Sequence, residues 1–181
     1  MHWQSPGPDN TLHTIEAALE AARERKIRYI VVASSTGDTA VKLADKAQNL
    51  VCVTYVNGFH EPGKITLLPE NRVLLEQRGT SILSTTHVLS GAERGISRKF
   101  GGSNPVEIMA ATLRMLGQGV KVCVEVAVMA LDAGLIPYGQ DVIAIAGSAK
   151  GADTAVIIRP AHAANILDTY ISEIICKPSS K

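Results

Sequence analysis

The stretch YIVVASSTGDTAVKLA, which spans Tyr29 to Ala44, decides the expected fold class of this chain. Its apolar and β-branched beginning at Ile30–Ala33 is typical of a buried parallel strand. The apolar spacing within Ala40–Ala44 is typical of a helix. Because a strand passes directly into a helix through small hydroxyl residues and a glycine, the stretch predicts an α/β fold.

This strand-to-helix turn is also a candidate anion site. Its backbone N–H groups lie at the positive end of a helix dipole, where phosphate or carboxylate binds readily. The turn matches neither the glycine pattern of dinucleotide folds nor that of P-loop NTPases. An ordinary turn with a serine or threonine helix cap is the alternative. The residues of the candidate site are Ser34, Ser35, Thr36, Gly37, Asp38 and Thr39.

The composition predicts a compact protein with one domain over residues 1–181, an N-terminal arm at 1–10 and a polar tail at 177–181. Hydrophobic residues make up 46% of the chain and charged residues 19%. A net charge of +1 excludes the strongly basic class of nucleic-acid-binding proteins. The chain has neither a run of 18 apolar residues nor a signal-peptide pattern in its arm. We therefore expect a cytoplasmic protein with no nucleic-acid or membrane partner.

The three cysteines, Cys52, Cys123 and Cys176, are far apart in the sequence. They form no C-x-x-C pair, and two of them lie within apolar runs. We expect buried thiols rather than a metal or redox site.

Strand and helix patterns alternate along the whole chain. The expected strands are 27–33, 50–56, 81–85, 141–146, 154–159 and a final edge strand at 170–176. The expected helices are 12–26, one that ends near 48, 69–78, 105–116 and 120–131, with a weak helical turn at 161–169. Residues 120–131 also alternate like a strand, but the segment ends like a helix. The loop Gly147–Gly151 is too short for a parallel crossover, so strands 141–146 and 154–159 should form an antiparallel hairpin.

Two further features concern charged side chains. Residues 87–102 contain four glycines and are predicted to form a long functional loop. Within it, Arg94, Arg98 and Lys99 are candidates to clamp a second anionic group, and the alternative is a solvated face. Glu125 lies in an apolar helix and needs a partner if it is buried. The two alternatives are an ion pair with Arg159 and a position that faces the cleft.

A second loop, after strand 141–146, resembles the first in composition. If the first and fourth strands are neighbours, both loops face one crevice at a topological switch point, where open α/β sheets bind ligands. The alternative for Asp38 and Asp153 is that they only cap their loops through hydrogen bonds. The candidate residues here are Gly147, Ser148, Lys150, Gly151, Asp153 and Thr154, with Asn57, Gly58 and His87 in the loops after the second and third strands.

Five separated blocks of the sequence carry a family resemblance. They are VVASSTGDTA, VTYVNGF, HVLSGAERGISRKFGG, VKVCVEVAVMALDAGLIP and GADTAVIIRPAH. Together they resemble stand-alone archaeal and bacterial proteins related to the pyruvate kinase C-terminal domain. The resemblance implies a three-layer α/β/α fold with sheet order 3-2-1-4-5 and strand five antiparallel.

The same resemblance implies a function. In pyruvate kinase, the counterpart of residues 34–39 grips the phosphate of a sugar-phosphate effector, and Asp38 stands where that loop typically carries a basic residue. Members of the stand-alone family are associated with FMN. The catalytic barrel of pyruvate kinase has no counterpart here, so pyruvate kinase activity is not expected.

The leading hypothesis is therefore a protein that binds FMN or a related phosphorylated nucleotide. Residues 34–39 would hold the phosphate, residues 147–154 would lie opposite, and the flavin ring would lie near Asn57, Gly58 and His87. Bound flavin would allow weak oxidoreductase chemistry. One alternative is a regulatory module that binds a sugar phosphate or nucleotide without catalysis. Another is an assembly subunit, since a homo-oligomer is compatible with this fold class.

Overall fold

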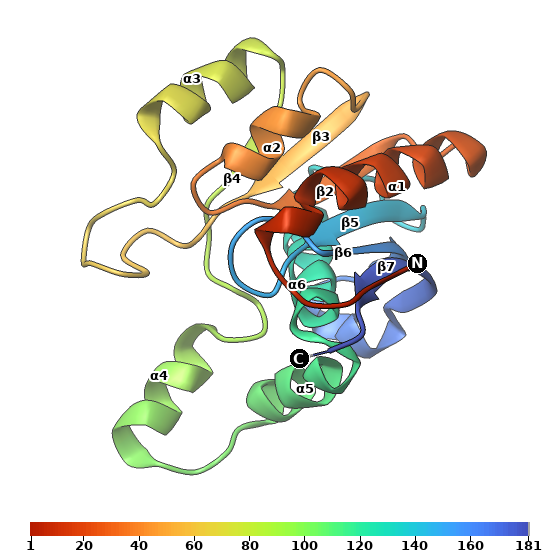
Figure 1. Ribbon diagram of the computed structural model, residues 1–181. Helices are drawn as coiled ribbons and strands as arrows, with labels where there is room; N and C mark the ends of the chain where they lie inside the picture. Colours follow the sequence, from red (N-terminus) through yellow and green to blue (C-terminus); the bar gives the residue numbers. More distant parts are fainter. Residues whose placement is uncertain (181) are drawn as a thin grey trace.

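The computed structural model describes residues 1–180, and the last residue of the predicted polar tail, Lys181, lies outside this range. Its centre is a seven-stranded sheet of order β1-β7-β6-β5-β2-β3-β4 (Figure 1). The pairs β1–β7, β5–β2, β2–β3 and β3–β4 are parallel, and the pairs β7–β6 and β6–β5 are antiparallel. The strands are β1 (His2–Trp3), β2 (Tyr29–Ala33), β3 (Asn49–Val53), β4 (Ser81–Leu83), β5 (Val142–Ala146), β6 (Thr154–Arg159) and β7 (Tyr170–Pro178).

The predicted sheet order 3-2-1-4-5 does not match this sheet, because it stopped after five strands. Beyond the antiparallel strand β6, the sheet continues with β7 and then with β1 from the N-terminal arm. The N-terminal arm thus joins the sheet, and the amino group of Met1 donates a hydrogen bond to the carbonyl of Ile175 at 2.7 Å. The predicted hairpin of β5 and β6 is confirmed by the antiparallel register of Val142 with Ile158.

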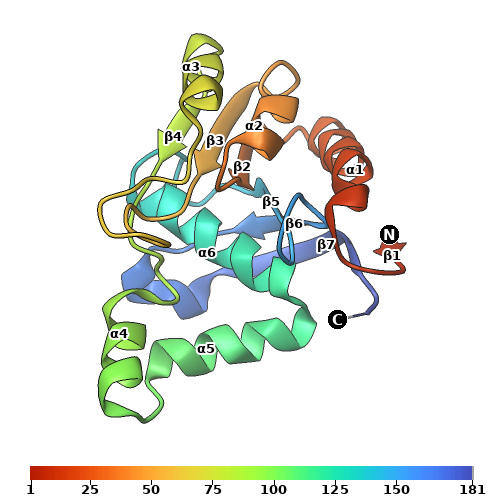
Figure 2. The same ribbon diagram turned by 60° about the vertical axis from the view of Figure 1, so that its left-hand side comes forward.

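Helices cover both faces of the sheet and make three layers (Figure 2). One core includes side chains of α1 and α2, among them Ile15 and Leu43, packed against Ile30 and Val32 of β2. The other core joins most of α6 to Val31 of β2. This alternation follows from the period of two along a strand. The helices are α1 (Thr11–Glu24), α2 (Asp38–Leu43), α3 (Pro69–Gln77), α4 (Gly91–Phe100), α5 (Pro105–Leu113) and α6 (Gln118–Asp132), with short 3-10 turns η1 (Pro8–Asn10), η2 (Arg114–Leu116) and η3 (Ala163–Asp168).

Helix α6 confirms the prediction of a buried helix over 120–131. Twelve of its fifteen residues are buried, because it lies under the sheet and its neighbours cover nearly its whole circumference. The predicted helix after β2 was too long, since α2 ends at Leu43 and β3 begins at Asn49. None of the helices among residues 1–180 is long and apolar enough to cross a lipid bilayer.

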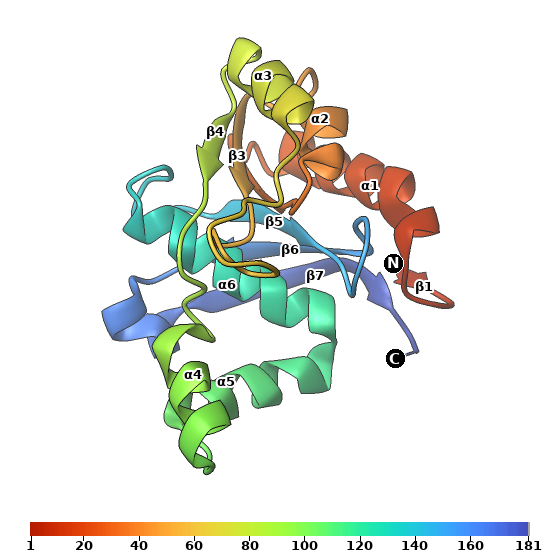
Figure 3. The same ribbon diagram turned by 90° about the vertical axis from the view of Figure 1, so that its left-hand side faces the viewer.

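The long loop predicted over residues 87–102 was wrong, because it contains helix α4 (Figure 3). Glycines at positions 91 and 95 mask the helical pattern, since glycine disfavours a helix interior. Hydrogen bonds to α5 offset this cost. The Glu93 carboxylate accepts the backbone N–H of Val106 at 2.9 Å. The predicted start of α5 at Asn104 and Pro105 is confirmed, with a capping box closed by Glu107.

Candidate functional site

The turn between β2 and α2 has its polar groups engaged within the chain. The Ser34 hydroxyl accepts the backbone N–H groups of Thr39 at 3.1 Å and Ala40 at 3.4 Å. The Thr36 hydroxyl donates to the Asp38 carboxylate at 2.7 Å. The donors that would hold a phosphate at Thr39 and Ala40 therefore already have an acceptor, in the manner of a helix cap. Ser35 is half-buried in the same turn.

Residues 67–71, which lead into α3, cover this turn. The Asn71 amide donates to the Thr36 carbonyl at 2.9 Å and to the Asp38 carboxylate at 2.8 Å. These hydrogen bonds, first from Thr36 and then from Asn71, lower the pKa of Asp38. Gly37 has φ +93°, and a Cβ there would lie 2.7 Å from the Asn71 Cβ. Gly37 therefore allows close packing of the chain on itself, and the role of residues 34–39 in anion binding stays a prediction.

The loop between β5 and β6 is held by one buried carboxylate. Asp153 is fully buried, and its carboxylate accepts the backbone N–H groups of Gly7 at 3.2 Å and Ser148 at 3.1 Å. It also accepts the Thr154 hydroxyl at 2.8 Å. Asp153 thus joins the N-terminal arm to the β5–β6 loop. The capping alternative considered for Asp38 and Asp153 describes both hydrogen-bond networks.

Close packing accounts for the small residues around this loop. Gly151 has φ +70°, and a Cβ there would clash with Thr11 and Pro8. A Cβ at Gly147 would lie 2.5 Å from the Gly151 carbonyl oxygen, and one at Gly119 of α6 would clash with Thr154. The exposed Lys150 borders a cavity of about 400 Å³. Its other lining residues are Pro6, Gly7, Pro8, Ser148 and Ala149. Strands β2 and β5 are neighbours as expected, but their two loops are tied to different segments of the chain.

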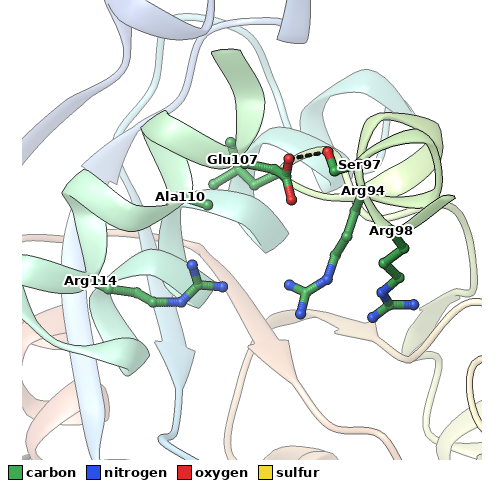
Figure 4. Close-up of a pocket in the computed structure, with 7 residues that line it drawn as sticks. Arg94, Ser97, Arg98, Glu107, Ala110 and Arg114 are labelled. Atoms are coloured by element: carbon green, nitrogen blue, oxygen red, sulfur yellow. Dashed lines mark hydrogen bonds between the residues drawn. The ribbon is translucent and has the colours of Figure 1, made fainter. Parts of the chain in front are cut away.

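A cavity of about 350 Å³ lies between α4 and α5 and is lined by three arginines (Figure 4). Arg94 and Arg98 extend from successive turns of α4, and Arg114 extends toward them from η2. Leu89, Ser97, Glu107 and Ala110 complete the lining. The sequence had singled out Arg94 and Arg98 as an anion clamp, and the structure brings them to one cavity. Lys99 lies outside it, with its ammonium 5.4 Å from the ring centre of Phe100.

None of these three guanidinium groups forms an ion pair with a carboxylate in the described part of the chain. The Arg114 Nε donates to the neutral amide of Gln118 at 2.8 Å. Glu107 also lines the cavity, but its carboxylate accepts hydrogen bonds from the Ser97 hydroxyl and the Asn104 backbone. Ser97 first, and Arg94 more weakly, lower the pKa of Glu107. The cavity therefore has a surplus of positive charge that is suited to an anion.

A buried ion pair lies beside this cavity, on the first turns of α6. Lys121 and Glu125 are 5% and 4% exposed, and the Lys121 ammonium donates to the Glu125 carboxylate at 2.5 Å. The other Glu125 oxygen accepts the Leu89 backbone N–H at 3.0 Å. Burial lowers the pKa of Lys121, Glu125 raises it, and Arg114 and Arg94 lower it. The expected ion pair between Glu125 and Arg159 was wrong. The Arg159 Nε instead lies 2.9 Å from an Asp141 carboxylate oxygen.

An aromatic cluster lies after the carboxyl ends of β3 and β4. The Tyr55 and Phe59 rings are stacked with centres 4.1 Å apart, and His87 lies 5.6 Å from Tyr55 and 5.5 Å from Phe59. Burial lowers the pKa of His87, and the nearby Glu125 acts in the opposite direction. Asn57 and Gly58 belong to the turn that carries Phe59, and the Gly58 N–H donates to the Lys64 carbonyl at 2.9 Å.

Other predicted chemistry is limited by burial. Cys52, Cys123 and Cys176 are buried thiols, as predicted, and burial raises the pKa of Cys52 to about 12. Among residues 1–180, no three histidine, cysteine, aspartate or glutamate side chains are grouped to hold a metal ion.

The sequence patterns gave no indication that Arg114, Lys121 and Tyr55 belong to these sites. Arg114 lies 16 or more residues from the other two arginines, and only the folding of α4 against α5 brings them together. Lys121 could have been found, because it lies four residues before Glu125 on a helix that had been predicted. The aromatic spacing of Tyr55 and Phe59 carried no distinctive signal in a loop.

Comparison with known protein families shows which family this chain belongs to. The family model of the pyruvate kinase alpha/beta domain matches residues 13–158. The chain belongs to this family. The match covers the sheet from β2 to most of β6, together with all six α-helices except the first residues of α1.

One solved structure similar to this member of the family is a pyruvate kinase from Cryptosporidium parvum in complex with ADP. It has 18% sequence identity and a TM-score of 0.39, and the similarity covers 80% of this chain and 22% of that protein. The chain thus spans about a fifth of the length of that kinase.

Proposed function

We propose that this protein binds a small phosphorylated ligand, with FMN as the first candidate, and that its phosphate lies among Arg94, Arg98 and Arg114. One observation carries the proposal. Three guanidinium groups from two elements line one cavity, and no carboxylate in the described residues pairs with any of them. Glu107 in the lining offsets only part of this positive charge, and a phosphate relieves the remaining repulsion through charge-assisted hydrogen bonds.

The arginine cavity suits a phosphate better than the turn at residues 34–39. In the turn, Thr39 and Ala40 already donate to Ser34, so a phosphate would have to displace that hydroxyl. In the cavity, the guanidinium groups can turn toward a ligand without breaking an ion pair. The volume of about 350 Å³ is within the lower part of the range for small-molecule sites.

The aromatic cluster suits a planar ring system. Phe59 is 46% exposed and stacks on Tyr55, so an isoalloxazine ring could extend the stack. The chain itself connects the cluster to the cavity, since His87 belongs to the cluster and Leu89, two residues later, lines the cavity. Bound FMN would supply electron transfer. The residues of this chain would hold its phosphate and cover its ring.

A sugar phosphate bound without catalysis is the second candidate. The polar groups that line the cavity are three guanidinium groups, the Glu107 carboxylate and the Ser97 hydroxyl that donates to it. This lining is suited to an anion and contains no aromatic side chain that would favour a ring. A ligand confined to the cavity would therefore need only a phosphate and a small polar body.

Calorimetric titration with matched ligands separates these possibilities. FMN, riboflavin and a hexose bisphosphate would be compared at low salt, where charge contacts are least screened. FMN binding with little riboflavin binding would assign the affinity to the phosphate. Binding of the hexose bisphosphate alone would favour the second candidate.

A charge-neutral variant locates the phosphate. Arg94→Gln with Arg114→Gln should weaken binding by at least about a hundredfold, because each charge-assisted hydrogen bond contributes roughly 1.5–3 kcal/mol. Arg23→Gln with Arg28→Gln removes the same charge from exposed positions outside the cavity and should change affinity less than about threefold. Equal losses in both double variants, or no binding of any phosphorylated ligand by the wild type, would contradict the proposal.

A further inference from the structure

Helices α4 and α5 and the turn η2 expose several large apolar side chains to solvent. On α4, Ile96 is 52% exposed and Phe100 is 75% exposed, one helical turn apart. On α5 and η2, Ile108 is 56%, Met115 is 76% and Leu116 is 49% exposed. We call these five residues the apolar face. Single exposed apolar residues are ordinary, but five on three consecutive elements mark an interaction surface.

Helix α4 contributes no side chain to either hydrophobic core. None of its residues is buried. Its links to α5 are polar, through Glu93 to the Val106 N–H and through Ser97 to Asn104 at 2.7 Å. A helix with a marked apolar side normally buries that side. The arginines cannot do this for Ile96, because Arg94 and Arg98 lie two residues before and after it, more than a quarter-turn around the helix.

The size of the apolar face fits one half of a protein interface. Side chains of this kind with these exposures present on the order of 100 Å² each, or roughly 500 Å² together. A standard interface buries about 800 Å² on each partner, of which about 60% is apolar. The face therefore supplies about the apolar area that one partner of a stable dimer needs.

We propose that the apolar face docks against the same face of a second copy of this chain. A two-fold pairing lets one set of residues serve both partners and closes after two copies. The chain carries a net charge of +1, so long-range repulsion between two copies is small, and Arg94 and Arg98 lie away from Ile96 around α4. Docking buries the apolar side of α4 and thereby holds Arg94 and Arg98 in place on its other side.

Sedimentation velocity over a range of micromolar concentrations tests this pairing. The wild type should sediment as a dimer that dissociates on dilution. Phe100→Asp and Met115→Asp should each raise the dimer dissociation constant at least about tenfold, because a buried charge would stand at the interface. Leu167→Asp is the matched control, since Leu167 is 85% exposed on η3, outside the face, and this variant should remain a dimer. Circular dichroism would verify that each variant is folded.

Cysteine cross-linking gives a second, independent measurement. The three natural cysteines are buried, so a single exposed cysteine reports on its own surroundings. Under mild oxidation, Phe100→Cys or Ile108→Cys should form a covalent dimer faster than Leu167→Cys. A wild type that is monomeric at all concentrations, a dimer that survives Phe100→Asp unchanged, or equal cross-linking at position 167 would overturn the proposal. A monomer that binds anionic lipid vesicles through α4 would likewise overturn it.

Discussion

The carboxyl ends of β2 and β5 differ from the α4–α5 hairpin in how their polar groups are satisfied. At β2 and β5, the side chains of Ser34, Asp38 and Asp153 each have hydrogen-bond partners within the chain. At the hairpin, Arg94 and Arg98 face a cavity and form no ion pair among the described residues. Both regions are rich in the residue types that bind anions, yet only one retains groups able to bind a ligand without first breaking internal contacts.

This difference separates stability from ligand binding. A buried carboxylate that accepts three hydrogen bonds holds a loop and the N-terminal arm together, and its loss should be felt in the free energy of unfolding. An arginine without a carboxylate partner contributes little to folding. Its substitution should instead lower the affinity for a phosphorylated ligand. Substitutions near the ends of β2 and β5 should therefore lower stability more than affinity. Substitutions of the hairpin arginines should lower affinity more than stability.

The largest stability effect is expected at the buried pair beside the cavity. Glu125→Ala leaves the Lys121 ammonium buried without a carboxylate and removes the acceptor of the Leu89 N–H. We expect unfolding free energy to fall by roughly 3–5 kcal/mol in urea denaturation. The double variant Lys121→Met/Glu125→Leu should recover most of this loss, because no charge remains buried.

The chain offers a matched control for that variant. Arg72 and Glu76 form an ion pair with the same four-residue spacing at the surface of α3, at 3.2 Å. Glu76→Ala should cost less than about 0.5 kcal/mol. A similar cost for both glutamates would show that burial of the Lys121–Glu125 pair has no energetic consequence.

A smaller loss is expected at Asp153. Asp153→Ala leaves the N–H groups of Gly7 and Ser148 without their acceptor, and should lower the free energy of unfolding by roughly 2–3 kcal/mol. Its affinity for a phosphorylated ligand, measured well below the melting temperature, should not change. The exposed Asp9→Ala is the control and should be nearly neutral. Lost affinity with intact stability would reverse the roles assigned to the two regions.

The smallest effect is a pH dependence at Asp38. Hydrogen bonds from Thr36 and Asn71 lower its pKa below 3.8 in the folded protein. Its ionised form therefore adds stability above the unfolded pKa, and this contribution is lost as pH falls through the lower folded value. Urea midpoints of the wild type should drop more than those of Asp38→Asn between about pH 5 and pH 3. Parallel curves would contradict the role of Asp38 as a capping carboxylate.

Much of the fold could be predicted from local patterns. Apolar runs located β2, β5 and β6, and the short loop between β5 and β6 required an antiparallel hairpin. The pattern could not show that His2 and Trp3 add a strand beside β7, because a two-residue strand has no periodicity. Glycines concealed α4, whose stability comes from hydrogen bonds to α5 that are set by tertiary structure.

The candidate site was predicted less well than the fold, for a similar reason. The residue types around Ser34 and Asp153 suit anion binding, but sequence cannot tell whether their donors are already occupied. Arg94 and Arg98 were found as cations in a region thought to be a loop. Arg114 joins them only because η2 follows α5 back toward α4, which no local pattern could reveal.

The most direct measurement is an NMR titration with inorganic phosphate that observes arginine Nε–H and backbone N–H signals together. The account predicts saturable shifts of the Nε–H signals of Arg94 and Arg98, with the backbone signals of Thr39 and Ala40 unchanged. Saturable shifts at Thr39 and Ala40 without any change at the arginines would contradict it and would assign phosphate binding to the turn after β2.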